Sequence, residues 1–180
     1  MGTGSLDKFK EARAVLSEFG LDLKLHEIER VEIQADDLET IAIFSVKQIE
    51  MGIRPIVVED AGLFIGHFRG FPGPYSSYAL DTIGLEGVLK LMEGVESRKA
   101  SFRSAVAYRH GDEIKSFTGI VDGTISQDIK GTHGFGYDPI FIPDEGDGRT
   151  LGEMASDEKN ALSHRSRAFR RLGEWLVSAG

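Results

Sequence analysis

The stretch Pro55-Ile56-Val57-Val58-Glu59-Asp60 decides the fold class. A short apolar run with β-branched residues predicts a buried strand, and this one ends in two adjacent carboxylates. Oxygen-rich ends of this kind hold Mg²⁺, and a carboxylate there can also take a proton from an attacking water. The alternative is a helix cap or a solvated turn, and the stretch alone leaves both open.

Both helices and further strands are expected around this strand. Helical spacing of apolar residues predicts helices, and runs of β-formers on both sides of the turn at 110–113 predict a hairpin. Because helices alternate with strands early in the chain, we predict an α/β fold: an elongated mixed β-sheet flanked by helices, with two lobes and a central cleft, in a single domain over residues 1–180. The expected helices span 7–19, 36–49, 85–92 and 156–178; the expected strands span 21–25, 55–58, 139–143 and the hairpin 100–125.

Composition narrows the class of protein. The 180 residues carry a net charge of −8, which argues against binding to the backbones of DNA or RNA. The chain has no cysteine, so disulfides and thiolate metal sites are excluded, and a reducing cytoplasm suits it. The apolar runs are too short to span a membrane, and we expect neither a signal segment nor a membrane partner. An acidic protein that binds a polyanion must gather its cations locally or recruit a divalent metal.

The beginning of the chain has the pattern of a phosphate site. Thr3-Gly4-Ser5 is a glycine-containing turn that opens the first expected helix, and helix N-termini present free N–H groups to phosphate. Thr3 and Ser5 add hydroxyl groups, and Lys8 adds a positive charge. The alternative is an ordinary capped helix.

Two later segments point to a planar ligand. The glycine-rich loop 131–136 and the residues after it include Phe135 and Tyr137, and an aromatic ring can stack on a base. If 156–178 is one helix, Arg165 falls within its apolar face and His164 at the edge of that face. A buried arginine needs an anionic or acceptor partner. An internal ion pair satisfies that need, but together with the loop a ligand is the favoured interpretation.

Taken jointly, these segments resemble the inosine triphosphate pyrophosphatase family. The resemblance rests on six motifs in the same order along the chain. They are Thr3-Gly4-Ser5-Leu6-Asp7-Lys8-Phe9-Lys10-Glu11, Glu32-Ile33-Gln34, Val58-Glu59-Asp60-Ala61-Gly62-Leu63, Gly70-Phe71-Pro72-Gly73-Pro74-Tyr75, Phe135-Gly136-Tyr137-Asp138-Pro139 and Glu158-Lys159-Asn160-Ala161-Leu162-Ser163-His164-Arg165. Ser5 departs from the family's asparagine.

The resemblance implies an elongated two-lobed fold, a homodimer, and hydrolysis of inosine, deoxyinosine or xanthosine triphosphate to the monophosphate and pyrophosphate. It assigns the triphosphate to Thr3, Gly4 and Lys8, with Ser5 at the same turn. It assigns Mg²⁺ to Glu32 and Asp60, and catalysis to Asp60, Lys8 and Glu32. It assigns recognition of the base and its surroundings to Phe135, Tyr137, Asp138, Lys159, Ser163, His164 and Arg165.

The base preference has a physical reason. Inosine and xanthosine carry an acceptor oxygen at C6, which the donors His164 and Arg165 can satisfy, whereas adenine presents an amino group there. Two other functions stay open from the residues: a nucleotide-binding protein without catalysis, and a pyrophosphatase that acts on other nucleoside triphosphates.

Overall fold

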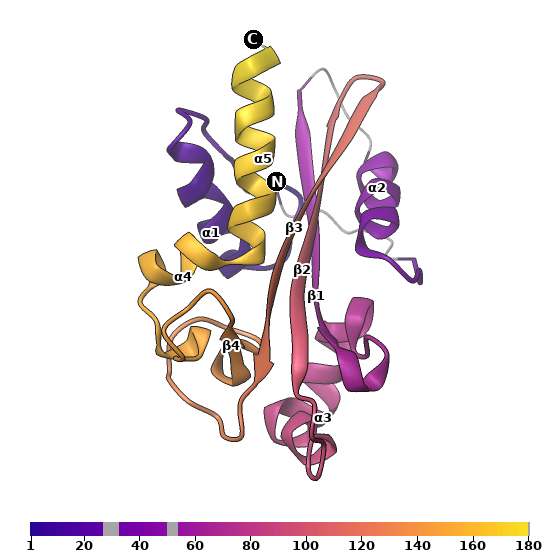
Figure 1. The fold of residues 1–180 in the computed structure, drawn as a ribbon. Coiled ribbons are helices and arrows are strands. Elements are labelled where there is room, and N and C mark those ends of the chain that lie inside the picture. The colour runs from indigo at the N-terminus through magenta and orange to yellow at the C-terminus, as the bar shows by residue number, and fades with distance from the viewer. Residues whose placement is uncertain (27–32, 50–53, 180) are drawn as a thin grey trace. The chain divides into compact units, whose positions relative to one another are not determined.

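The computed structural model describes residues 1–26, 33–49 and 54–179 (Figure 1). The chain forms two compact units, each built from separate segments. Unit 1 comprises 1–61, 104–119 and 164–180, and unit 2 comprises 62–103 and 120–163. The single domain and the cleft between two lobes stay predictions.

The strands form one four-stranded sheet in the order β1-β2-β3-β4. Its strands are β1 (Ile56–Ile65), β2 (Lys99–His110), β3 (Glu113–Ile125) and β4 (Phe141–Pro143). β2 and β3 make the predicted hairpin, and β4 runs antiparallel to β3 with Gly123 opposite Pro143. With five α-helices in the described part of the chain, the predicted α/β class is confirmed.

Parallel pairing occurs only as isolated bridges among the described residues. Gly2 bridges to both His26 and Val58 in the parallel sense, and its N–H donates to the carbonyl of Val57 at 2.8 Å. The strand predicted at 21–25 was wrong, because only His26 makes a bridge. The first residues of the chain are nevertheless tied to β1, and this contact holds the start of the Thr3–Lys8 segment.

β1 is longer than predicted, and it does not end at the two carboxylates. It continues through Glu59 and Asp60 to Ile65. Within unit 2, Gly62 makes this continuation possible, because a side chain there would lie 2.2 Å from the carbonyl oxygen of Gly73. The next residue, Leu63, donates its N–H to the Ser76 hydroxyl at 2.8 Å. The carboxylates therefore lie within a strand.

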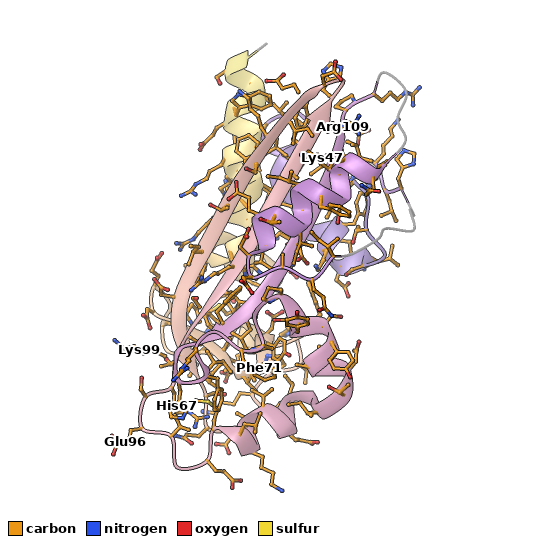
Figure 2. All side chains as sticks on the ribbon, turned by 90° about the vertical axis from the view of Figure 1, so that its right-hand side faces the viewer. Lys47, His67, Phe71, Glu96, Lys99 and Arg109 are labelled. Carbon is orange, nitrogen blue, oxygen red and sulfur yellow. The ribbon has the colours of Figure 1, made fainter. Side chains whose placement is uncertain are left out.

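Unit 1 has helices on both faces of its part of the sheet (Figure 1). α1 (Leu6–Ser17) and α5 (His164–Ala179) pack together on one face, and α2 (Leu38–Gln48) covers the other. Arg109 on β2 donates to the carbonyls of Val46, Lys47 and Ile49 at the end of α2, at 3.2 to 3.4 Å (Figure 2). The buried apolar core of unit 1 consists of Met1, Ala12, Val15, Leu16, Leu23, Val57, Val106, Tyr108, Ala168, Phe169 and Leu172.

Unit 2 has a core of its own. α3 (Ser76–Leu91) begins earlier than predicted and is kinked at Gly84, whose φ of 67° an L side chain rarely adopts. Short 3₁₀ turns at 73–75, 138–140 and 151–153 pack around the core. The core consists of Leu63, Ile65, Val88, Met92, Ala100, Phe102, Val121, Ile125, Tyr137, Ile140, Phe141, Leu151 and Met154.

The last predicted helix is two helices. α4 (Ser156–Leu162) ends at Ser163, whose ψ of 149° is extended, and α5 begins at the next residue. The prediction of one continuous helix was wrong, because helical spacing in the sequence does not reveal a single extended residue. Ser163 belongs to unit 2 and His164 to unit 1, so the break lies where the chain passes from one unit to the other.

In the described part of the chain, every helix is too short or too polar to traverse a lipid bilayer.

Candidate active site

The predicted phosphate segment opens α1 as expected. Ser5 is the N-cap of this helix: its hydroxyl accepts the Lys8 N–H at 3.3 Å, while its own N–H donates to the Thr3 hydroxyl at 3.1 Å. Serine and asparagine are both good N-caps, so the departure from the family motif keeps the helix start intact. Gly4 is exposed, and a side chain there would meet nothing within 4 Å. The backbone at this helix N-terminus is therefore accessible to an anion.

A buried carboxylate lies next to this segment. Glu59 has no exposed surface, and its two oxygens have different partners. Oε2 lies 3.2 Å from the Lys8 ammonium, whereas Oε1 accepts from Arg165 Nε at 3.0 Å and from the Ser104 hydroxyl at 2.9 Å. One carboxylate of β1 thus contacts α1, β2 and α5, all within unit 1.

The charges around Glu59 keep it ionised. Burial by itself raises the pKa of the Glu59 carboxyl, but the Arg165 guanidinium, the Lys8 ammonium, His164 and the Ser104 hydrogen bond together outweigh burial. The net result is a pKa lowered from 4.5 to about 2. Glu59 is therefore an anion at neutral pH.

Arg165 is buried, as the sequence predicted, and its partners are internal. Besides Glu59 it contacts Glu11 of α1, with the Arg165 Nη1 atom 2.6 Å from a Glu11 oxygen. The internal ion pair that the sequence left as the alternative is present, and contact of Arg165 with a ligand stays a prediction. Gly119 of β3 lets α5 approach this closely, because a side chain there would lie 2.0 Å from the His164 carbonyl oxygen.

Asp60 is placed differently from its neighbour. Successive side chains of a strand point to opposite faces, so Asp60 faces away from the Lys8–Glu59–Arg165 group, and it is only half-buried. Glu32, the other predicted metal ligand, lies outside the described residues. Over the described ranges 1–26, 33–49 and 54–179, no three His, Cys, Asp or Glu side chains gather as a metal site.

In unit 2, Asp138 organises the predicted base-binding loop. Its Oδ2 atom accepts the N–H of Phe135 at 2.7 Å and pairs with the ammonium of Lys159. That ammonium lies 4.5 Å from the centre of the Phe135 ring, a cation–π contact. Asp138 and Lys159 are buried, whereas Phe135 is half-buried. The pair thus fixes both the backbone and the ring of Phe135.

Tyr137 has a structural position in the same loop. It lies in the apolar core of unit 2, and its hydroxyl donates to the carbonyl of Ser76 at 2.7 Å. Burial, and secondly the charge of Asp81, raise the pKa of Tyr137 to about 12. Tyr137 therefore stays neutral and anchors the loop.

The predicted residues are divided between the two units. Thr3, Gly4, Ser5, Lys8, Asp60, His164 and Arg165 belong to unit 1; Phe135, Tyr137, Asp138, Lys159 and Ser163 belong to unit 2. The predicted site omitted Glu59, Glu11 and Ser104. Glu59 could have been found from the sequence as a charged residue that directly follows an apolar strand. If that strand continues, the charged residue is buried and needs partners.

The chain is similar in sequence to known proteins over nearly its whole length. The model of the Ham1 family matches residues 1–175. A dITP/XTP pyrophosphatase of Methanopyrus kandleri is 45% identical over 175 residues, which cover 96% of this chain and 93% of that protein. One of Saccharolobus solfataricus is 45% identical over 177 residues, covering 98% and 92%.

Solved structures share the fold. A HAM1 protein from Coxiella burnetii superposes with a TM-score of 0.83 at 27% identity, covering 98% of this chain and 96% of that one. A nucleoside-triphosphatase, dITP/XTP pyrophosphatase, from Mycobacterium abscessus gives 0.72 at 29% identity, with 95% of each chain covered. The likenesses extend over nearly the whole length and confirm the resemblance seen in the six motifs: the chain belongs to the Ham1 family.

Proposed function

We propose that this protein hydrolyses non-standard purine nucleoside triphosphates, the inosine, deoxyinosine and xanthosine forms, to the monophosphate and pyrophosphate. The observation that carries the proposal is the start of α1, where an accessible helix N-terminus lies beside the ammonium of Lys8. Relatives that are 45% identical to this chain over 93% and 92% of their own length bear the name dITP/XTP pyrophosphatase.

The reaction breaks the bond between the α-phosphorus and the oxygen that bridges to the β-phosphorus. Water supplies the new oxygen on the monophosphate, and pyrophosphate leaves. The N–H groups around Gly4 and the charge of Lys8 bind the phosphates and stabilise the charge that develops on the leaving group. Asp60, half-buried and on the other face of β1 from Glu59, takes the proton of the attacking water.

The metal in this proposal is Mg²⁺, held by Asp60 and Glu32. Mg²⁺ typically binds through one or two carboxylates, with waters and substrate phosphates as its other ligands, so the absence of a larger acidic cluster among the described residues fits it. When bound, the ion neutralises phosphate charge and lowers the pKa of a bound water. Removal of divalent ions with a chelator should abolish pyrophosphate release, and excess Mg²⁺ should restore it.

Base selection is the task that we propose for two kinds of residue, hydrogen-bond donors and an aromatic ring. In unit 1, Arg165 and His164 donate to the C6 oxygen, which the amino group of adenine cannot accept from them. In unit 2, Phe135 offers a half-buried ring for stacking, held by Asp138 and Lys159. We propose further that the protein works as a homodimer in the cytoplasm, and light scattering of the purified protein tests the dimer.

Pyrophosphate release from inosine triphosphate, with adenosine and uridine triphosphates measured beside it, tests the function. We expect strong preference for inosine triphosphate. Equal turnover of all three would indicate a pyrophosphatase of broad specificity. Binding of inosine triphosphate without any release would indicate a nucleotide-binding protein, the second function left open by the sequence.

A further inference from the structure

Two cations with different tasks share one buried carboxylate. In the proposed function, Lys8 binds the phosphates and Arg165 donates to the base. Both contact Glu59: Lys8 at Oε2, 3.2 Å away, and the Arg165 Nε atom at Oε1, 3.0 Å away. We propose that Glu59 is a positioning residue that fixes these two side chains relative to each other, so that recognition of the base and binding of the phosphates depend on the same carboxylate. This inference rests on the proposed function.

The surroundings of Glu59 make it a rigid reference point. It lies within β1, its side chain is fully buried, and Ser104 of β2 donates a hydrogen bond to the same oxygen that Arg165 contacts. A carboxylate held by a strand, by two hydrogen-bond donors at Oε1 and by an ion pair at Oε2 has little freedom to change rotamer. The cations come from α1 and α5, and Glu59 is a carboxylate that both of them contact.

Arg165 is held from two directions. Its Nε atom contacts Glu59, and its Nη1 atom contacts Glu11. Glu11 lies one turn after Lys8 on α1. Two cations therefore face two carboxylates. Neutralising Glu59 removes one of these two negative charges, which both loosens the geometry and disfavours the approach of the two cations to each other.

The arrangement suits a binding task better than a purely structural one. An ion pair that served stability alone gains little over apolar packing of the same volume. The Lys8 side chain keeps 23% of its surface exposed while it contacts Glu59. Its ammonium can thus meet a phosphate oxygen on one side while Glu59 holds it on the other.

The test compares kcat and KM of the Glu59→Gln variant for inosine and adenosine triphosphates. Glutamine keeps the shape and one acceptor but turns a donor toward Lys8 and removes the charge. We expect a lower kcat and a higher KM for inosine triphosphate, and a fall of at least about tenfold in its preference over adenosine triphosphate, the effect of losing one charge-assisted hydrogen bond. Glu18→Gln is the matched control, because Glu18 pairs with Arg170 on the surface of the same unit and should leave both constants unchanged.

A second variant tests the same proposal if Glu59→Gln does not fold. Ser104→Ala keeps every charge and removes only the hydroxyl that steadies Oε1. It should reduce the base preference in the same direction by about threefold, less than Glu59→Gln does, because one hydrogen bond is lost while the carboxylate charge is kept. If both variants fold and the preference for inosine triphosphate is unchanged while only stability falls, the positioning role is wrong and the proposed function stands.

A readout that needs no catalysis separates the two proposals. In the unmodified protein, the Arg165 Nε–H should exchange slowly with solvent and give a distinct guanidinium NMR signal, because it donates to a buried carboxylate. That signal should exchange at least about tenfold faster in Ser104→Ala, where the carboxylate is less firmly held. Absence of turnover in the unmodified protein would reject the proposed function, whereas fast exchange of this N–H in the unmodified protein would reject the positioning role.

Discussion

Glu59 and Asp60 are consecutive residues of β1, yet Glu59 is fully buried and Asp60 is half-buried. The alternation of side chains along a strand places them on opposite faces of the sheet. Glu59 is held by Lys8, Arg165 and Ser104. The adjacent carboxylates therefore lie in different surroundings: one is buried among cations, and the other is half-buried on the opposite face.

Asp60→Asn should abolish hydrolysis but not binding. The amide cannot take a proton from water and is a weaker ligand for Mg²⁺, so we expect kcat for inosine triphosphate to fall by at least about 10²-fold. Pyrophosphate release and equilibrium binding of the nucleotide measure the two effects. Asp122→Asn, an exposed aspartate of β3, is the control and should keep full activity. Full activity in Asp60→Asn would show that Asp60 takes no part in the reaction.

Phe135→Ala should weaken binding more than it slows the chemical step. Stacking of a base on an aromatic ring contributes about 1–3 kcal/mol, so KM for inosine triphosphate should rise roughly tenfold or more, with a smaller change in kcat. Steady-state kinetics checks this. Tyr78→Ala removes an aromatic side chain of unit 2 that is 71% exposed and should leave KM unchanged. An unaltered KM in Phe135→Ala would show that the ring does not contact the base.

The charge of Glu59 should make stability depend on pH under acidic conditions. Because the folded-state pKa is lowered from 4.5 to about 2, chiefly by Arg165 and Lys8 against the cost of burial, the carboxylate stabilises the folded protein above pH 4.5. That contribution, on the order of 3 kcal/mol, is lost progressively as the pH falls from 4.5 toward 2.

Denaturant unfolding at pH 6, 4 and 2.5 measures this loss. The Glu59→Gln variant should have a lower free energy of unfolding at pH 6, and the difference from the unmodified protein should shrink as the pH falls. A difference that is constant over this range would contradict the ionised, paired state of Glu59.

Gly119→Ala should displace the start of α5. The added methyl group would lie 2.0 Å from the His164 carbonyl oxygen and 2.7 Å from the Ala168 nitrogen, both of them backbone atoms of α5. We expect the free energy of unfolding to fall by at least about 2 kcal/mol and activity to fall with it, because Arg165 moves with the helix. Ile120→Ala changes the next residue, whose side chain is 46% exposed, and should cost less. An unchanged free energy of unfolding in Gly119→Ala would mean that α5 does not pack against β3 in this way.

Local patterns were sufficient for most elements. The helix at the start of the chain, the helix before residue 49 and the hairpin were predicted because their apolar spacing and turn residues are local properties. The strand at 21–25, the end of β1 and the single last helix were wrong. The first two depend on contacts with another segment of the chain, namely the pairing of Gly2 with His26 and the approach of Gly62 to Gly73. The third depends on one extended residue, Ser163, which helical spacing does not reveal.

The amino-acid sequence by itself determined the α/β class, the family and the residues that carry its motifs, since residue types and their order are one-dimensional information. Only the tertiary structure decided which of those residues touch. Glu59 gave no sign in the sequence that it would meet Lys8, Ser104 and Arg165, because these lie 51, 45 and 106 positions away. Long-range packing of α1 and α5 on one face of the sheet brings their charges to a single buried carboxylate, and burial then makes each of those contacts strong.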